Sequence, residues 1–190
     1  LVNDDKFGRP AGRVIEQRVE WMQEENAPFE GVLFVGVMVV NGEPIVLEYN
    51  VRFGDPECEI LMPLIESKVS DLFYYGATKQ LDKLDIKIKN KFAVGVVMAS
   101  KNYPYSASAH SIIELSNIVD EELLENSHIS FAGVEKKDDV LLATGGRVAV
   151  CVGLGDTVKE ARDRAYLLSS EISFDGKKFR KDIAYQALKN

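Results

Sequence analysis

Three side chains that can bind a metal ion and phosphate stand at every second position, Glu48, Asn50 and Arg52. Side chains of an extended strand alternate between its two faces, so these three are predicted to share one face. A carboxylate and an amide oxygen are ligands that a hard cation prefers, and a guanidinium can bind anionic oxygens with two parallel hydrogen bonds. The pattern suits Mg²⁺ held together with nucleotide phosphates. A polar strand face open to solvent is an equally good interpretation of the spacing alone.

The strand that must carry these side chains is predicted from residue 45 to residue 53. Its other face is apolar and is expected to pack on a core; it consists of Ile45, Leu47, Tyr49, Val51 and Phe53. The preceding segment, residues 32–40, is apolar on both faces, which is typical of a central strand. Asn41-Gly42 between the two is a strong signal for a two-residue hairpin turn.

A helix is predicted to begin directly after the strand. Gly54 permits a sharp turn, Asp55 can cap a helix, and Pro56 suits the first helical position. Glu57 places negative charge at the positive end of the helix dipole. The polar strand face is therefore expected to lead straight into a helix N-terminus.

Other helices and connections are read from turn residues and apolar spacing. Residues 1–12 are expected to form a loop, and residues 12–26 an amphipathic helix. Pro63 is expected to break the helix that follows residue 57, and Gly76 to end the next one. Residues 81–91 are predicted to be an edge strand or a linker.

The segment 52–59, which reads RFGDPECE, resembles the signature of the phosphoribosylamine–glycine ligases. These enzymes are also called glycinamide ribonucleotide synthetases, and they are ATP-grasp enzymes of purine synthesis. The resemblance extends, in the family's order, to residues 31–38, 145–148, 153–157 and 179–183. It covers nearly the whole chain and is more specific than any single motif.

The resemblance implies an α+β fold with two domains. Residues 1–88 are expected to form the C-terminal portion of an ATP-grasp domain, an antiparallel sheet with helices that carries the metal and ATP site. Residues 89–190 are expected to form the family's β-rich C-terminal domain, a small antiparallel sheet with a helix. The chain starts midway through the family's pattern, so we expect a fragment whose partner is the missing amino-terminal half and which is inactive alone.

The resemblance also implies a reaction and its ligands. Glycine, activated by ATP as glycyl phosphate, is joined to 5-phosphoribosylamine, giving glycinamide ribonucleotide, ADP and phosphate. Glu48 and Asn50 match the residues that are implied to coordinate Mg²⁺, or Mn²⁺, bridging the nucleotide phosphates. Arg52 is the candidate catalytic residue, either clamping the transferring phosphoryl group or forming an ion pair that orients Glu48.

Four further residues are candidates for substrate binding. Asp55 or Glu57 is expected to receive the glycine ammonium, and the sequence does not choose between them. From the residues alone, a helix cap is the simpler interpretation of Asp55. Arg147 and Arg180, with Lys181, are candidates for the phosphate of phosphoribosylamine. The simpler interpretation of Arg147 is an exposed side chain in a tight hairpin at Gly145-Gly146.

Two other functions remain open. One is an ATP-grasp carboxylate–amine ligase with a different acceptor, and the other is a non-catalytic β-rich binding module. A dinucleotide-binding reading of residues 153–158 fails, because Val158 stands at the third glycine position and no parallel strand follows. A turn followed by a capped helix is the better interpretation of this segment.

In the second half, strands are predicted at residues 92–99, 112–115, 129–134, 140–143 and 147–152. Asp138-Asp139 and Gly145-Gly146 are expected to be hairpin connections. Thr157 and Glu160 form a capping box that opens a helix to about Glu171.

Composition excludes several classes of partner. The net charge of -7 disfavours nucleic acid and anionic membranes. Cys58 and Cys151 are the 2 cysteines, too few for a disulfide framework, so a reducing, cytoplasmic location is expected. No apolar run approaches the roughly 20 residues that span a bilayer. His110 and His128 have no ligand-spaced partners and are expected to lie in loops.

Overall fold

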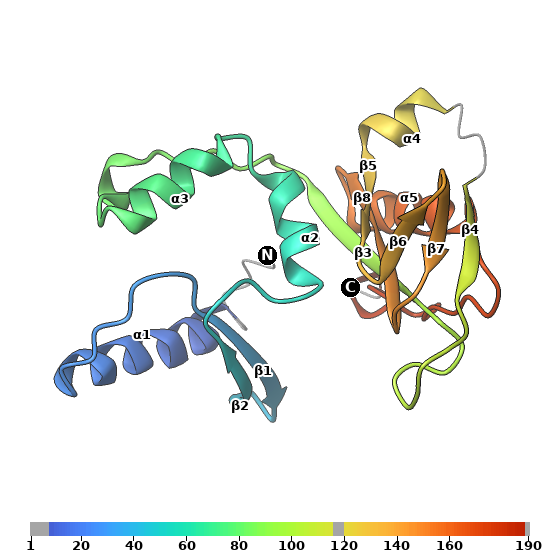
Figure 1. Cartoon of the computed structure of the whole chain (residues 1–190). Helices are drawn as coiled ribbons and strands as arrows, with labels where there is room; N and C mark the ends of the chain where they lie inside the picture. The colour runs from blue at the N-terminus through green and yellow to red at the C-terminus, as the bar shows by residue number, and fades with distance from the viewer. Residues whose placement is uncertain (1–7, 116–119, 189–190) are drawn as a thin grey trace. The chain divides into compact units, whose positions relative to one another are not determined.

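The computed structural model describes residues 8–115 and 120–188 and shows helices combined with antiparallel sheets, as predicted (Figure 1). The chain divides into two compact units. The first comprises the described part of Leu1–Asp55 together with Ser67–Ile86, and the second comprises Pro56–Glu66 together with the described part of Lys87–Asn190. Within the described ranges, no helix has both the length and the apolar character that crossing a membrane requires.

The first unit is built on a helix and a β-hairpin. Helix α1 (Gly8–Glu24) contacts β2 (Glu43–Asn50), which pairs antiparallel with β1 (Phe34–Val40). The helix begins inside the segment predicted to be a loop, and residues 1–7 of that prediction lie outside the described residues. Asn41 and Gly42 both have positive φ, 53° and 87°, which confirms the predicted two-residue turn.

The apolar side chains of this hairpin are more exposed than the sequence predicts. In the described structure β1 and β2 form a sheet of 2 strands, so β1 is not a central strand here. Met38 on β1 is 54% exposed, and Leu47 on the expected core face of β2 is 62% exposed. Both predictions assumed packing partners that the described residues do not supply.

The first unit also contains helical segments later in the chain. Helix α3 (Val69–Ala77) is followed by the 3₁₀ turn η2 (Leu81–Lys83). Gly76 lies inside α3 and does not end it; the residue with positive φ is Lys79, at 59°. Of the two alternatives predicted for residues 81–91, an edge strand or a linker, the structure shows the linker: this described segment contains no strand, and a single bridge pairs Ile88 with Ile65.

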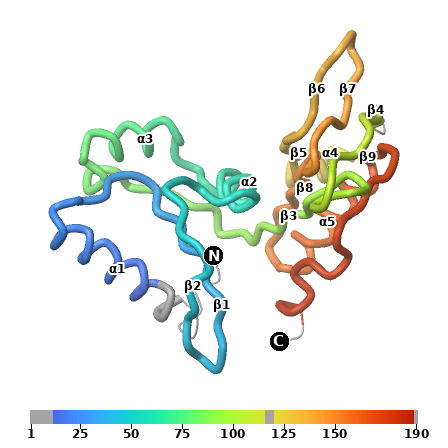
Figure 2. The backbone as a smooth tube through the Cα atoms, turned by 60° about the horizontal axis from the view of Figure 1, so that its bottom comes forward, coloured from blue at the N-terminus to red at the C-terminus, as the bar shows by residue number. Residues whose placement is uncertain are grey.

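The second unit contains two antiparallel sheets where one was expected. The first sheet has the order β3–β8–β5, formed by β3 (Phe92–Ala99), β8 (Arg147–Gly155) and β5 (Ser127–Phe131). The second has the order β6–β7–β4–β9, formed by β6 (Val134–Lys137), β7 (Val140–Ala143), β4 (Ser111–Leu115) and β9 (Ile172–Ser173). Figure 2 shows the β6–β7 hairpin extending from the body of this unit.

Short helices complete the second unit. They are α2 (Glu57–Leu61), η1 (Met62–Leu64), α4 (Glu121–Glu125) and η3 (Gln186–Leu188). Pro63 lies in η1, so the α-helix stops just before it, as predicted. The longer helix α5 (Val158–Ser170) packs on β8 and β3.

The predicted hairpin at Gly145-Gly146 is wrong, because β7 and β8 belong to different sheets. The chain crosses between the sheets here, and the crossing is held by Gly145 N, which donates to Gly133 O at 3.0 Å. A Cβ on Gly133 would lie 2.5 Å from Gly145 Cα, so neither position has room for a side chain. The turn at Asp138 and Asp139 is confirmed, with φ of 47° and 66°.

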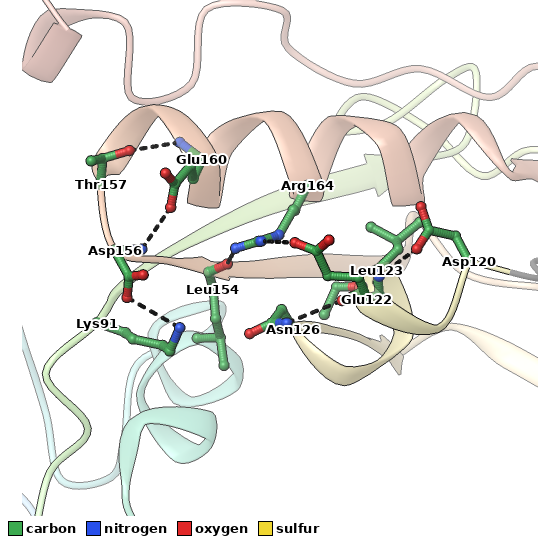
Figure 3. A network of polar contacts seen from close by, with 11 residues as sticks. Lys91, Asp120, Glu122, Leu123, Asn126, Leu154, Asp156, Thr157, Glu160 and Arg164 are labelled. Carbon is green, nitrogen blue, oxygen red and sulfur yellow. Dashed lines mark hydrogen bonds and ion pairs between the residues drawn. The ribbon is translucent and has the colours of Figure 1, made fainter.

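The N-terminus of α5 is capped as the sequence predicts (Figure 3). Thr157 accepts a hydrogen bond from Glu160 N at 3.1 Å, and the Glu160 carboxylate accepts one from Asp156 N at 2.9 Å. Further along α5, Arg164 donates to Leu154 O at 2.7 Å and to Glu122 on α4 at 2.6 Å. These contacts fix both helices on the sheet that contains β8.

Candidate functional site

Glu48 and Asn50 are brought side by side at the end of β2. The Asn50 amide donates from Nδ2 to Glu48 Oε1 over 3.0 Å. Glu48 is exposed and Asn50 half-buried. The hydrogen bond leaves the second carboxylate oxygen of Glu48 and the amide oxygen of Asn50 as hard oxygen donors at one place on the surface of the first unit.

The strand that carries this pair is irregular. The register shifts from Gly36 opposite Glu48 to Val37 opposite Val46, so Leu47 is an extra, bulged residue. The predicted alternation from residue 45 to residue 53 is therefore interrupted. A bulge changes the direction in which a neighbouring side chain points, and this bulge lies directly next to Glu48.

Arg52 is not positioned by strand alternation, because β2 ends at Asn50 and not at residue 53. Its guanidinium nitrogen Nη1 donates to the carbonyl oxygen of Phe53 at 2.6 Å. This bond holds the arginine side chain back along its own backbone. The site therefore combines two oxygen atoms that can bind a metal ion, on the strand, with the positively charged Arg52 two residues further along the chain.

The oxygen donors fit Mg²⁺ or Mn²⁺. Both ions prefer carboxylate and amide oxygens, and Mg²⁺ keeps several water or phosphate ligands when the protein supplies few. Within residues 8–115 and 120–188, no group of three or more His, Cys, Asp or Glu side chains could hold a metal ion. A cation at Glu48 and Asn50 would depend on water and phosphate for its remaining ligands.

Asp55 and Glu57 belong to different units, because the chain passes from the first unit to the second between Asp55 and Pro56. Asp55 is exposed and is the last residue of the first segment of the first unit. Glu57 is half-buried and is the first residue of α2, in the second unit. Pro56 takes the N-cap position predicted for Asp55 and is not the first helical residue, so both assignments are one position away from the prediction.

Arg147 and Arg180 have different surroundings from those expected. Arg147 is half-buried and begins the middle strand β8, so it is not the exposed arginine of a hairpin. Arg180 is exposed and forms a two-pronged ion pair with Asp182, at 2.9 and 2.6 Å. The hydrogen bonds with Asp182 raise the pKa of Arg180, and they lower the pKa of Asp182. A phosphate at Arg180 must compete with this carboxylate.

His128 is on strand β5 and not in a loop, contrary to the prediction, whereas His110 lies in a loop. His128 lines an open pocket of about 550 Å³ in the second unit together with Glu59 and Cys58. Burial lowers the pKa of His128, although a hydrogen bond with the backbone of Glu59 and the nearby Glu59 charge oppose that shift. Sequence reasoning did not single out Glu59, because its relation to β5 is not visible in the spacing.

Comparison with known proteins gives two matches to family models. Residues 2–58 match the ATP-grasp (A) domain of phosphoribosylglycinamide synthetase, and residues 93–186 match the C domain of the same enzyme. The protein is therefore of a class in which part of an ATP-grasp domain is followed, in the same chain, by the C domain of this enzyme. More particularly, the chain belongs to the phosphoribosylglycinamide synthetase family, as its sequence motifs predict.

Individual relatives extend over nearly all of the chain. The phosphoribosylamine–glycine ligase of Agrobacterium fabrum is 38% identical over 180 residues, which are 95% of this chain and 42% of that protein. A trifunctional purine biosynthetic protein of Chironomus tentans, adenosine-3, is 34% identical over 190 residues, 98% of this chain and 14% of that protein.

A solved structure also matches. The crystal structure of phosphoribosylamine–glycine ligase from Thermotoga maritima superimposes with a TM-score of 0.80 at 31% sequence identity, covering 96% of this chain and 44% of that one. This match confirms the predicted α+β fold. The chain spans less than half the length of the ligases that it matches.

Proposed function

We propose that this chain supplies the end of the ATP-grasp domain and the C domain of an enzyme that joins glycine to 5-phosphoribosylamine. In this proposal residues 1–88 belong to the ATP-grasp domain and residues 89–190 to the C domain. Pro56–Glu66 departs from that division, since its contacts group it with the second unit. The names of the A. fabrum and T. maritima relatives support the proposed substrates.

The proposed reaction has two steps. A carboxylate oxygen of glycine attacks the γ-phosphorus of ATP, ADP leaves, and glycyl phosphate forms. The amine of 5-phosphoribosylamine then attacks the glycyl carbonyl carbon, phosphate leaves, and the nitrogen loses a proton to give the amide. Neither step needs a protein nucleophile, so the protein contributes positioning and charge stabilisation.

The observation that carries the proposal is the hydrogen-bonded pair of Glu48 and Asn50, which lies inside the segment that matches the ATP-grasp model. These two side chains would hold Mg²⁺ or Mn²⁺, and the bound ion would neutralise charge on the nucleotide phosphates. Arg52 would bind the transferring phosphoryl group once its side chain exchanges Phe53 O for phosphate.

The remaining candidates would bind the other substrates. Asp55 or Glu57 would accept hydrogen bonds from the glycine ammonium, as carboxylates do for cationic donors. Arg147 and Arg180 would contact the phosphate of phosphoribosylamine. Arg180 would first have to release its ion pair with Asp182.

The exposed apolar surface of β1 and β2 supports a role as part of a larger domain. Met38, Ile45 and Leu47 on these strands are all exposed, and exposed apolar side chains that gather on one surface mark contacts with other protein parts. The amino-terminal half of the ligase would supply that partner, along with the rest of the nucleotide site. The 190-residue chain alone is therefore expected to bind nucleotide weakly and to show no turnover.

A chimera tests the proposal. The chain replaces its counterpart in the A. fabrum ligase, and phosphate release is measured with ATP, glycine and 5-phosphoribosylamine. We expect release that depends on both substrates, and a loss of about 100-fold or more for Glu48→Gln, since charge stabilisation is removed. Glu43→Gln, on an exposed position of the same strand, is the matched control and should retain activity.

Three results would contradict the proposal in different ways. Faster release with another amino acid or acceptor would indicate a different ATP-grasp ligase. Undiminished activity in Glu48→Ala and Asn50→Ala chimeras would favour a non-catalytic β-rich module. Turnover by the 190 residues alone would show that the amino-terminal half is not needed.

A further inference from the structure

The strand opposite the candidate metal ligand has a glycine at the position that faces it. Gly36 on β1 is the register partner of Glu48 on β2. We propose that Gly36 is a positioning residue, whose missing side chain lets the Glu48 carboxylate lie where Asn50 holds it for a cation. The inference rests on the proposed function, because it assigns the purpose of that placement.

The first argument is steric. A Cβ on Gly36 would lie 3.1 Å from Glu48 Cγ and 3.8 Å from Glu48 Oε1. The first distance is shorter than an ordinary contact between carbon atoms, which begins at about 3.5 Å. Even a methyl group therefore requires the Glu48 side chain to move by a few tenths of an ångström.

The second argument concerns which group gives way. The backbone of Gly36 is held in the ladder, since Val35 pairs with Tyr49 on one side and Val37 with Val46 on the other. The Glu48 side chain is exposed and has several rotatable bonds. A methyl group at position 36 thus displaces the carboxylate and leaves the hairpin intact.

The third argument is that this displacement acts on the hydrogen bond to Asn50. The bond is 3.0 Å long and joins Nδ2 of Asn50 to Oε1, the oxygen 3.8 Å from the added Cβ. The bulged residue Leu47 lies immediately before Glu48, so the strand already departs from regular alternation at this point. Gly36 and the bulge together determine where the carboxylate points.

The experiment uses the 190-residue chain labelled with ¹⁵N and titrated with MnCl₂, with and without ATP. Broadening of the amide signals of residues 48–50 gives a dissociation constant, and the Asn50 side-chain amide signal reports the hydrogen bond directly. For Gly36→Ala we expect roughly tenfold weaker Mn²⁺ binding, the size of effect seen when a ligand loses its orienting partner. The Asn50 side-chain signal should shift, and the thermal midpoint should stay that of the unmodified chain.

Gly76→Ala in the same unit is the matched control, because its Cβ would meet only Leu81 Cδ2 at 3.9 Å. Glu48→Gln separates the two proposals. If Glu48→Gln loses Mn²⁺ binding and Gly36→Ala does not, the positioning role is wrong and the metal site stands. If the unmodified chain shows no Mn²⁺ broadening at residues 48–50 even with ATP present, both are wrong.

A second measurement does not depend on how the variant folds. In the unmodified chain, a nuclear Overhauser contact between Gly36 Hα and Glu48 Hγ is expected from their placement across the hairpin. Its absence in a folded chain would overturn the positioning role, whatever Gly36→Ala does.

Discussion

Substitution of Gly153 by alanine should destabilise the second unit, because α5 packs directly on the backbone of β8 at this point. A Cβ on Gly153 would lie 2.3 Å from Ala161 O and 2.5 Å from Ala165 N. Both neighbours are helix backbone atoms, and Ala161 and Ala165 are fully buried. No side-chain rotation can relieve the overlap, so the helix itself must move away from the strand.

The size of the effect follows from that movement. Restoring an ordinary contact requires a shift of about 1 Å, and gaps of this size forfeit a quarter to a half of the dispersion energy across the interface. Overpacking of this kind costs about 1–3 kcal/mol, and the backbone contact places this case at about 3 kcal/mol. For a unit of this size, the thermal midpoint should fall by roughly 10 °C.

Urea denaturation followed through the NMR signals of β8 amides measures the second unit specifically. Gly76→Ala, in α3 of the first unit and with its nearest neighbour at 3.9 Å, is the control and should leave the unfolding of β8 unchanged. A loss below about 0.5 kcal/mol for Gly153→Ala, no more than an ordinary surface substitution, would refute the close packing of α5 on β8.

Three further predictions concern the second unit. Thr157→Ala should cost about 1 kcal/mol of unfolding free energy through the lost cap, while Thr157→Ser should restore it; equal stability of all three chains would contradict the capping role. Because burial lowers the pKa of His128 from 6.5, the unfolded chain takes up the proton first as pH falls, so stability should decrease below about pH 6.5. Denaturation at several pH values should show a flatter profile in His128→Gln, and an unchanged slope would contradict this assignment. Burial raises the pKa of Cys151 to about 11, so mass spectrometry after iodoacetamide treatment at pH 8 should find Cys58 modified first; equal rates would argue against the buried thiol.

Features that depend on neighbouring residues in the sequence were predictable. The turns at Asn41-Gly42 and Asp138-Asp139 require positive φ in two consecutive residues, and the residue types reveal this directly. The cap at Thr157 likewise involves groups within one helical turn. In each case the determining contacts lie within four residues, so the pattern contains the information.

Gly145-Gly146 shows why the same kind of signal failed elsewhere. The pair has the composition of a hairpin turn, but Gly145 is needed because Gly133 approaches it and Gly146 because the Tyr103 ring lies against it, both from other parts of the chain. Gly153 and Gly155 resembled a turn and are strand residues beneath a helix. A glycine that permits close packing cannot be distinguished from one that permits a turn without the partner's position.

The sequence predicted only part of the candidate site, because the rest depends on how the two strands pair. The two-residue spacing placed Glu48 and Asn50 together, which their hydrogen bond bears out as geometry. The bulge at Leu47 and the end of the strand at Asn50 are set by pairing with β1, so the alternation could not place Arg52. The apolar pattern of β1 predicted burial, and the described residues leave Met38 and Val40 exposed.

The most direct test of the metal site is a crystal structure of the chimera with MnCl₂ and a non-hydrolysable ATP analogue. Manganese is located by its anomalous scattering, independently of the protein model. We predict an anomalous peak bonded to a Glu48 carboxylate oxygen and to Asn50 Oδ1, at about 2.0–2.1 Å as for Mg²⁺, and shared with the nucleotide phosphates. A manganese ion that is bound to the nucleotide but contacted by neither Glu48 nor Asn50 would contradict the account.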